Sequence, residues 1–328
     1  MSTLTLTAIL PNYNHARFLP AALESVIAQT RKPDELLIVD DGSTDDSVAI
    51  IESYLPRLPN ARFERNRSNV GALRIINRML VDAKGSIVCT INADDIVYPD
   101  FFATGLAMLE QYPEAALFSG RAHLLDEAGK VLGVLETPMP RWQAGFIGPA
   151  EAAAFLMRDE GWFLGQATLF RRAPLVAAGG FPEALYSFND GYISRLLALR
   201  HGACYTPTVL AGWRRMRGGM AWLQTADLQN AENLTIAVMK TMRAAGDVFP
   251  AGYPQRWQSR YMFGVRRFIL SEERRTAAKR GLGPYLVALL REWFWVPILF
   301  ARMRPRDAIT VARRRIGYRL RSIIRWER

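Results

Sequence analysis

The stretch LLIVDDGSTDDS at residues 36–47 decides the fold class of this chain. Its first four residues form a short apolar run, which predicts a buried strand. Two aspartates and a glycine follow at 40–42, and Ser43-Thr44-Asp45 offers capping side chains for a helix over 48–55. The order is strand, acidic loop and helix, which is the repeating unit of an α/β fold.

The same order of elements recurs on both sides of this stretch. Apolar patterns predict strands at 4–10, 62–65 and 86–91 and helices at 15–29 and 70–83. Strands that alternate with helices predict a mostly parallel, Rossmann-like central sheet with flanking helices, whose ligands bind at the carboxyl ends of the strands. Asp94 and Asp95 follow the last of these strands, so we expect the fold to bring them near the acids at 40–45.

The pattern becomes mixed beyond residue 100, and the chain ends in a helical region. We expect a helix up to Gln111, strands at 115–119 and 162–170, a hairpin turn at 126–130, a helix at 190–200 and mainly helix over 222–280. The predicted domains are therefore an α/β unit at 1–218 and a helical, basic region at 219–328.

The net charge of +11 is concentrated at the C-terminal end. Residues 274–328 contain 15 Lys and Arg against 3 acids, which leaves residues 1–273 close to neutral. This distribution disfavours a nucleic-acid partner and favours a tail that meets anionic lipid. The apolar segment 284–301 is interrupted by Arg291, Glu292 and Pro297, so we expect 284–328 to lie on an anionic membrane surface rather than to cross it. Packing on the protein is the alternative for its aromatic residues.

Cysteine usage points to the inside of the cell. Cys89 and Cys204 lie in apolar runs that are typical of buried strands, which suits reduced thiols better than a disulfide. The first residues lack the pattern of a signal peptide. We therefore expect a cytoplasmic protein, peripheral at the inner face of the cell membrane.

Three carboxylates stand where chemistry is expected. Asp94 and Asp95 directly follow an apolar strand, where they have little structural purpose, and paired carboxylates are ligands that Mg²⁺ and Mn²⁺ prefer. Asp190 follows a glycine-rich break at 179–182 and begins a helix, so it can act as a general base or simply cap that helix. Asn69 and Gly71 likewise either bind a ligand or start a helix.

Five pieces of the chain, taken together, resemble one family. They are PNYN at 11–14, VDDGSTDDS at 39–47, NVG at 69–71, INADDIVYPD at 91–100 and GGFPEALYSFND at 179–190. In this order they resemble the family 2 glycosyltransferases of the GT-A fold, of the bacterial type that makes cell-envelope polysaccharides. The resemblance covers about residues 3–215.

The resemblance implies a metal-dependent enzyme that moves a sugar from a nucleotide-diphosphate sugar, with UDP-sugars favoured, to a glycan or lipid-linked acceptor. Asp190 is then the base of an inverting, non-processive transfer, and Asp94 is the ligand of Mn²⁺ or Mg²⁺. In this scheme Tyr13 lies against the nucleotide base and Asp41 hydrogen-bonds the edge of that base. The full set of residues expected to bind the nucleotide-sugar is Pro11, Tyr13, Asp41, Asn69, Gly71, Asn92, Ala93, Asp95 and Gln166.

Two positions depart from the family pattern. Asn92 stands where many members have an acid, and Met216 stands where many have a histidine, so Arg214, Arg215 or Arg217 is expected to neutralise the phosphates. These departures keep open a catalytically degenerate member that serves as a scaffold or glycan-binding subunit. Nucleotidyl transfer is disfavoured because the segment after the first strand is not a glycine-rich phosphate loop.

Overall fold

The computed structural model describes residues 4–216, 219–280, 283–284 and 286–288. These residues divide into two units. The first contains the described residues up to 153 together with 161–216, and the second contains 154–160 and the described residues from 219 onward. The first unit thus lacks 154–160, which the predicted domain 1–218 includes. Almost all of the segment 284–328, expected to meet a membrane, lies outside the described residues.

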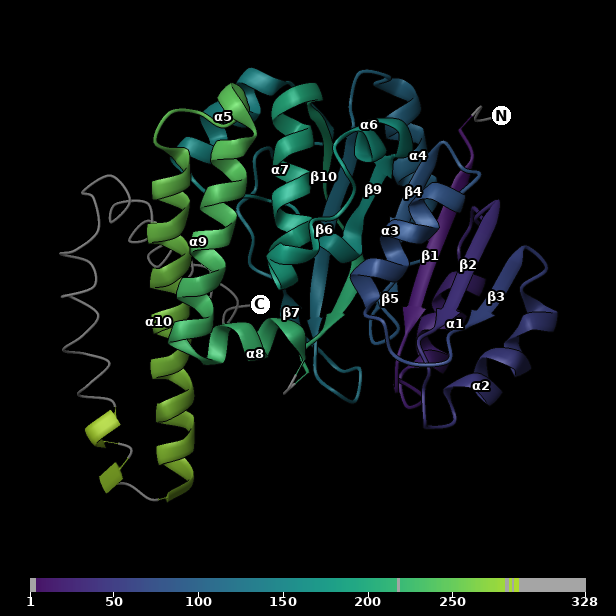
Figure 1. The fold of residues 1–328 in the computed structure, drawn as a ribbon, viewed down its shortest axis with the longest axis horizontal. Helices are drawn as coiled ribbons and strands as arrows, with labels where there is room; N and C mark the ends of the chain where they lie inside the picture. The colour runs from purple at the N-terminus through teal and green to yellow at the C-terminus, as the bar shows by residue number, and fades with distance from the viewer. Residues whose placement is uncertain (1–3, 217–218, 281–282, 285, 289–328) are drawn as a thin grey trace, which may run out of the picture. The chain divides into compact units, whose positions relative to one another are not determined.

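The first unit is built on one ten-stranded sheet in the order β3-β2-β1-β4-β9-β6-β10-β5, with β7 paired to β6 and β8 paired to β10 (Figure 1). The strands are β1 (Leu6–Asn12), β2 (Glu35–Asp40), β3 (Ala61–Arg65), β4 (Ile87–Thr90), β5 (Ile96–Val97), β6 (Leu117–Leu125), β7 (Val131–Val134), β8 (Gly145–Ile147), β9 (Thr168–Arg171) and β10 (Ala203–Arg214). Strands β1 to β4 are parallel, and β9 is antiparallel to both β4 and β6. Consequently β6 and β10 run in the same direction as β1, whereas β5, β7, β8 and β9 are antiparallel to their neighbours, so the α/β class is confirmed and the sheet is mixed rather than mostly parallel.

The helices of this unit are α1 (Leu19–Ile27), α2 (Ser47–Tyr54), α3 (Ala72–Asp82), α4 (Phe101–Gln111), α6 (Arg172–Ala177) and α7 (Asn189–His201), with short 3₁₀ segments η1 (Leu55–Arg57), η2 (Gly165–Ala167) and η3 (Glu183–Phe188); the residues of α5 (Pro149–Arg158) are divided between the two units. Right-handed crossovers place α1 and α2 on one face of the sheet. The connection through α3 returns past β2 and β1 to β4, so α3 lies on the other face. Figure 1 shows α3 on the same face as α6 and α7. The strand order therefore reverses between β1 and β4, which is where such sheets bind ligands.

The core forms because the inner strands are apolar on both faces. Nearly all residues of β1, β2 and β4 are buried, and α1 contributes Leu19, Leu23 and Val26 to the same cluster as Phe101 and Phe102 of α4. Burial of each such side chain is worth about 1.5–3 kcal/mol. Helix α1 begins at residue 19 rather than at the predicted 15, because the preceding residues form a turn closed on the carbonyl of His15.

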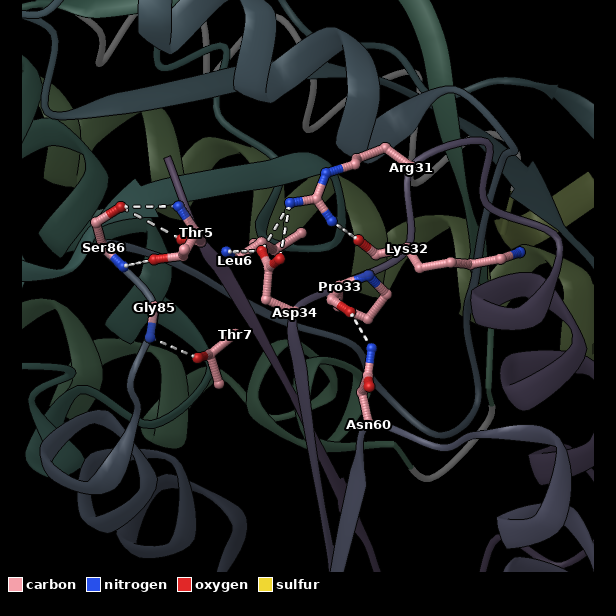
Figure 2. Close-up of polar contacts among 10 residues, drawn as sticks. All are labelled: Thr5, Leu6, Thr7, Arg31, Lys32, Pro33, Asp34, Asn60, Gly85 and Ser86. Atoms are coloured by element: carbon pink, nitrogen blue, oxygen red, sulfur yellow. Dashed lines mark hydrogen bonds and ion pairs between the residues drawn. The ribbon is translucent and has the colours of Figure 1, made fainter. Parts of the chain in front are cut away.

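The amino ends of the parallel strands are tied together by polar side chains (Figure 2). The Asp34 carboxylate accepts a hydrogen bond from the backbone N–H of Leu6 at 2.7 Å, and both of its oxygens accept from Nη2 of Arg31. Thr7 Oγ1 accepts from the N–H of Gly85 at 2.9 Å, and a Cβ at residue 85 would lie 2.5 Å from the nitrogen of Thr7. These bonds fix the register in which β2 and β4 enter the sheet beside β1.

The predicted strand at 162–170 is shorter in the structure. Residues 165–167 form η2, with Ala167 donating to the carbonyl of Leu164, and pairing begins only at Thr168. Trp162 is fully buried without being in a strand, and periodicity alone does not separate these two cases. The predicted turn at 126–130 is confirmed by the hydrogen bond from Asp126 N to Lys130 O.

The second unit is helical, as expected for 222–280. It contains α8 (Met220–Ala226), α9 (Leu228–Ala244), the short η4 (Gly246–Val248) and α10 (Tyr253–Arg280). Asp227 caps α9 by accepting from Asn230 N, and the buried guanidinium of Arg260 donates to the carbonyls of Leu156 and Met157. In the parts of the chain that the structure describes, we find no helix with the length and apolar character that crossing a membrane requires.

Candidate active site

Two aspartates that follow β4 differ sharply in their surroundings. Asp95 is buried, and its two carboxylate oxygens accept from the N–H of Arg214 and from Asn92 Nδ2, each at 2.8 Å. Burial, followed by the charge of Asp94, raises the pKa of Asp95 to about 7. Asp95 is thus held in place by the chain itself and carries an ionisation that costs free energy near neutral pH.

Asp94 is half-buried, and its carboxylate makes no hydrogen bond or ion pair with any residue in the described part of the chain. Only its backbone carbonyl is engaged, by Arg214 Nε at 2.8 Å. A carboxylate is a hard oxygen ligand, and Mg²⁺ and Mn²⁺ are commonly held by one or two of these plus phosphate oxygens. Asp94 beside Asp95 fits this donor set. Across the described ranges, no three His, Cys, Asp or Glu side chains gather into a metal cluster.

Arg214 at the end of β10 holds this edge of the sheet together. Its guanidinium donates to the carbonyls of Asp126 and Glu127 and lies 5.0 Å from the ring centre of Phe18. The side chain is buried and engaged in these contacts, and its expected role toward the phosphates stays a prediction. Of the three arginines expected for that task, Arg215 is exposed and Arg217 lies outside the described residues.

Hydrogen bonds connect the loop after β1 to the loop after β2. Asp40 accepts from Asn12 Nδ2 at 2.8 Å and from Ser43 N at 2.9 Å, and Asn14 Oδ1 accepts from Thr44 N. Ser43 therefore does not cap α2. Asp45 accepts from the N–H of Ser47 at 3.1 Å, but the N-cap residue is Asp46 and its side chain makes no capping hydrogen bond.

Pro11 and Tyr13 lie at the carboxyl end of β1, where Tyr13 is 42% exposed. This places an aromatic ring at the edge where the strand order reverses. The loop that carries it is fixed from beneath by the bonds of Asp40, Ser43 and Asn14. The ring is thus accessible on a well-supported backbone.

Both carboxylate oxygens of Asp41 accept hydrogen bonds from other residues of the chain. Its carboxylate accepts from Asn66 Nδ2 at 2.7 Å, from Val70 N at 3.0 Å and from Gly71 N at 2.8 Å. Gly71 precedes α3 with a φ of 98°, a conformation that glycine adopts readily. Asp41 thus positions the segment 69–71, of which Asn69 is exposed. Its role toward a base edge stays a prediction, as does that of Asn69.

Asp190 is the second residue of α7 and does not cap it. One carboxylate oxygen accepts from Gly191 N at 2.7 Å, and the other lies so close to Gly165 that a Cβ there would be 2.3 Å away. Burial raises the pKa of Asp190, while the bond from Gly191 and the charge of Arg195 oppose this rise. A carboxylate with a raised pKa is a better base than an ordinary aspartate.

The fold brings Asp190 toward the acids that follow β4. Gly165 and Gln166 belong to η2, which packs against β5, β6 and β10. Strand β5 begins at Ile96, directly after Asp95. The half-buried Gln166 lies in this segment, next to Gly165, and Asn92 and Ala93 complete the loop after β4.

No sequence signal predicts the supporting contacts of three residues, although Arg214 was expected to neutralise the phosphates. Arg214 supports Asp95, Gly165 contacts Asp190, and Arg195 donates to the carbonyl of Gly191 at 2.7 Å with its guanidinium 4.9 Å from the ring centre of Phe188. The partners of Arg214 and Gly165 are far away in sequence, and those of Arg195 lie within and just before its own helix, α7. Only the folded chain identifies them.

Residues 7–146 match the sequence model of the family described as Glycosyl transferase family 2. The chain is 38% identical over 107 residues to the uncharacterized glycosyltransferase YibD of Escherichia coli, a match that covers 33% of this chain and 31% of the relative. It is 24% identical over 192 residues to the amylovoran biosynthesis glycosyltransferase AmsE of Erwinia amylovora, which covers 58% and 68%. The curated relatives are thus matched over only part of their length.

Two solved structures share the fold. TarS 1–349 of S. aureus, in complex with UDP-GlcNAc, has a TM-score of 0.58 at 16% identity and matches 97% of this chain and 92% of its own. The mannosyltransferase PcManGT of Pyrobaculum calidifontis, in complex with GDP-Man and Mn²⁺, has a TM-score of 0.54 at 18% identity, with 94% and 83% covered. The expected GT-A fold class is confirmed by these likenesses.

Proposed function

We propose that this chain is a family 2 glycosyltransferase that transfers a sugar from a nucleotide-diphosphate sugar to a glycan or lipid-linked acceptor in cell-surface polysaccharide synthesis. The observation that carries the proposal is the carboxylate of Asp94, which has no partner among the described residues, beside the buried Asp95 and next to the point where the sheet reverses its strand order. UDP-sugars are the favoured donors.

The residues divide the work as follows in this proposal. Tyr13 and Pro11 contact the nucleotide base, and the segment held by Asp41 borders the nucleotide. Asp94, oriented by Arg214 through its backbone, holds Mn²⁺ or Mg²⁺. The metal supplies positive charge to the departing diphosphate.

Asp190 takes the proton from the acceptor hydroxyl, and its raised pKa suits that task. A single displacement with a base on the opposite side of the sugar inverts the anomeric centre. We propose a non-processive enzyme that adds one or a few sugars.

A thermal-shift panel tests the donor site. The full chain is heated with UDP, GDP, dTDP and their sugars, each with and without Mn²⁺. We expect one nucleotide to raise the melting temperature in a Mn²⁺-dependent way, since a ligand at 100 times its Kd stabilises the native state by about 2.7 kcal/mol. Asp94→Asn is expected to lose the Mn²⁺-dependent part of the shift.

Glu52→Gln is the matched control, because Glu52 is an exposed acid on α2 and its substitution removes the same charge. A full Mn²⁺-dependent shift in Asp94→Asn would contradict the metal site. No shift with any nucleotide in the folded wild-type chain would favour a scaffold or glycan-binding subunit instead.

We also propose that the chain is cytoplasmic and binds the inner face of the cell membrane through 284–328. The support is the charge of that segment, with most of the chain's excess arginine. Flotation with anionic vesicles tests it, with a variant truncated after residue 283 as the comparison. Equal flotation of both proteins, or binding to neutral vesicles alone, would reject the proposal.

A further inference from the structure

Tyr186 has an unusual backbone conformation close to the proposed base. Its φ of 43° and ψ of −119° interrupt η3, four residues before Asp190. Glycine adopts these angles readily, whereas a side chain with a Cβ is strained there. Such strain persists only where the surrounding structure holds the residue in place, and it concentrates at functional sites.

The neighbours of Tyr186 supply that hold. Asn77 of α3 accepts from Phe181 N and donates to Phe181 O, both at 2.8 Å, and Arg74 pairs with Glu183 at 3.0 Å. Leu185 is fully buried. On the other side, the ring of Phe188 lies against the guanidinium of Arg195. The segment is therefore pinned before and after residue 186.

The side chain of Tyr186 makes no polar or ring contact with the described part of the fold. It is 57% exposed and makes no hydrogen bond or ring contact with any other residue that the structure describes. Only its backbone carbonyl is engaged, by the amide of Asn189, the residue that precedes Asp190. The backbone of Tyr186 is thus held in place while its ring is exposed to solvent, four residues before the proposed base Asp190.

We infer that Tyr186 forms an acceptor subsite by stacking against the apolar face of a pyranose ring. This inference rests on the proposed function, in which Asp190 takes its proton from the acceptor hydroxyl. An acceptor sugar must then lie near Asp190, and an aromatic ring offers the flat, rigid contact area that the C–H face of a sugar fits.

Saturation-transfer NMR on the full chain tests this subsite. The protein is loaded with the nucleoside diphosphate that binds it and with Mn²⁺, and the probes are the methyl glycosides of glucose, galactose, mannose and N-acetylglucosamine. We expect saturation of ring protons in at least one probe. Tyr186→Phe should keep it, and Tyr186→Gly should weaken binding about 2- to 10-fold.

Stability separates a ligand contact from a structural role. Because glycine relieves the strain, Tyr186→Gly is expected to raise the melting temperature by about 2 °C while nucleotide binding stays unchanged. Trp142→Gly, which removes another exposed ring, is the control and should keep glycoside binding. A lower melting temperature, equal glycoside binding in Tyr186→Gly, or no saturation in a wild-type chain that binds nucleotide would overturn the inference. A wild-type chain that binds no nucleotide instead shows that the proposed function fails, and the subsite falls with it.

Discussion

Aspartates at the two ends of the parallel strands have opposite roles. The amino edge is the end of the sheet where these strands begin, and the carboxyl edge is the end where they finish. At the amino edge, the carboxylate of Asp34 accepts a hydrogen bond from Leu6 N and forms an ion pair with Arg31, so its negative charge is compensated within the chain (Figure 2). At the carboxyl edge, the carboxylate of Asp94 has no such partner in the described residues, and burial raises the pKa of both Asp95 and Asp190. Acids whose ionisation costs the fold free energy are more frequent at functional sites, which supports the proposal that the donor binds at the carboxyl ends of the strands.

The largest expected effect comes from Asp190→Asn. Removal of a general base lowers the rate of transfer about 10²- to 10⁴-fold. The fold should not suffer, because Asn has the same shape and the ionised carboxylate is disfavoured where it lies. Release of the nucleoside diphosphate from the donor gives the rate, and a melting curve gives the stability. Asp46→Asn, an exposed acid before α2, is the control. A variant with wild-type turnover would remove Asp190 from the site.

The second effect is in the acid limb of the pH profile. The base must be ionised, so kcat/KM should fall tenfold per pH unit below the raised pKa of Asp190, and this limb should lie above about 3.9, the value for a free aspartate. Because the folded pKa is raised, Asp190 contributes stability that is fully present below its unfolded pKa and is lost as pH rises through the folded pKa. Melting curves against pH for wild type and Asp190→Asn test this sign. A limb at or below 3.9 would contradict it.

Third in size is Gly165→Ala. The new Cβ would lie 2.3 Å from the carboxylate of Asp190, which must therefore move. A displacement of about 1 Å at a reacting group can cost about 10²-fold in rate. Gly264→Ala in α10 is the matched control, since a Cβ there meets nothing within 4 Å. Equal turnover in both variants would show that the position of Asp190 matters little.

At the amino edge, Asp34→Ala should affect stability and not the chemistry. The buried N–H of Leu6 loses its acceptor, which costs about 1–3 kcal/mol of unfolding free energy. Turnover per folded molecule should be unchanged. Urea unfolding and a rate at low temperature measure the two quantities. A variant that keeps its stability but loses its rate would reverse the comparison of the two edges.

The smallest effect belongs to Arg31→Met. Both members of the Arg31–Asp34 pair are more than a third exposed, so solvent screens it and its loss should cost only about 0.2–1 kcal/mol. Asp34 still accepts from Leu6 in this variant. A loss as large as that of Asp34→Ala would mean that the ion pair, and not the backbone hydrogen bond, locks the edge.

Local pattern was enough for most of the first unit. The apolar runs that end at Asp40 and Asp95 predicted β2 and β4, and the alternation with helices predicted a parallel sheet with ligands at its carboxyl edge. The pattern failed at 162–167, where an apolar run is buried as a turn. Burial and strand pairing leave the same mark on a sequence, so only pairing partners can separate them.

The resemblance to the family predicts which residues form the site, but only the tertiary structure shows what surrounds each of them. That Asp41 is saturated by Asn66, Val70 and Gly71 depends on a loop that closes back over the end of β2. That Arg214 is buried depends on β10 running alongside β6, more than 80 residues earlier in the chain. Neither contact is encoded in any local spacing.

Hydrophobic period and turn residues thus determined which segments are strands and helices, because these preferences act between residues close in sequence. The pairing of Asp95 with Arg214, the approach of Asp190 to Gly165 and the strained, exposed Tyr186 were decided only when distant segments packed together. Ionisation and accessibility are properties of that packing, since burial and neighbouring charges set the pKa of a carboxylate and its freedom to bind a ligand.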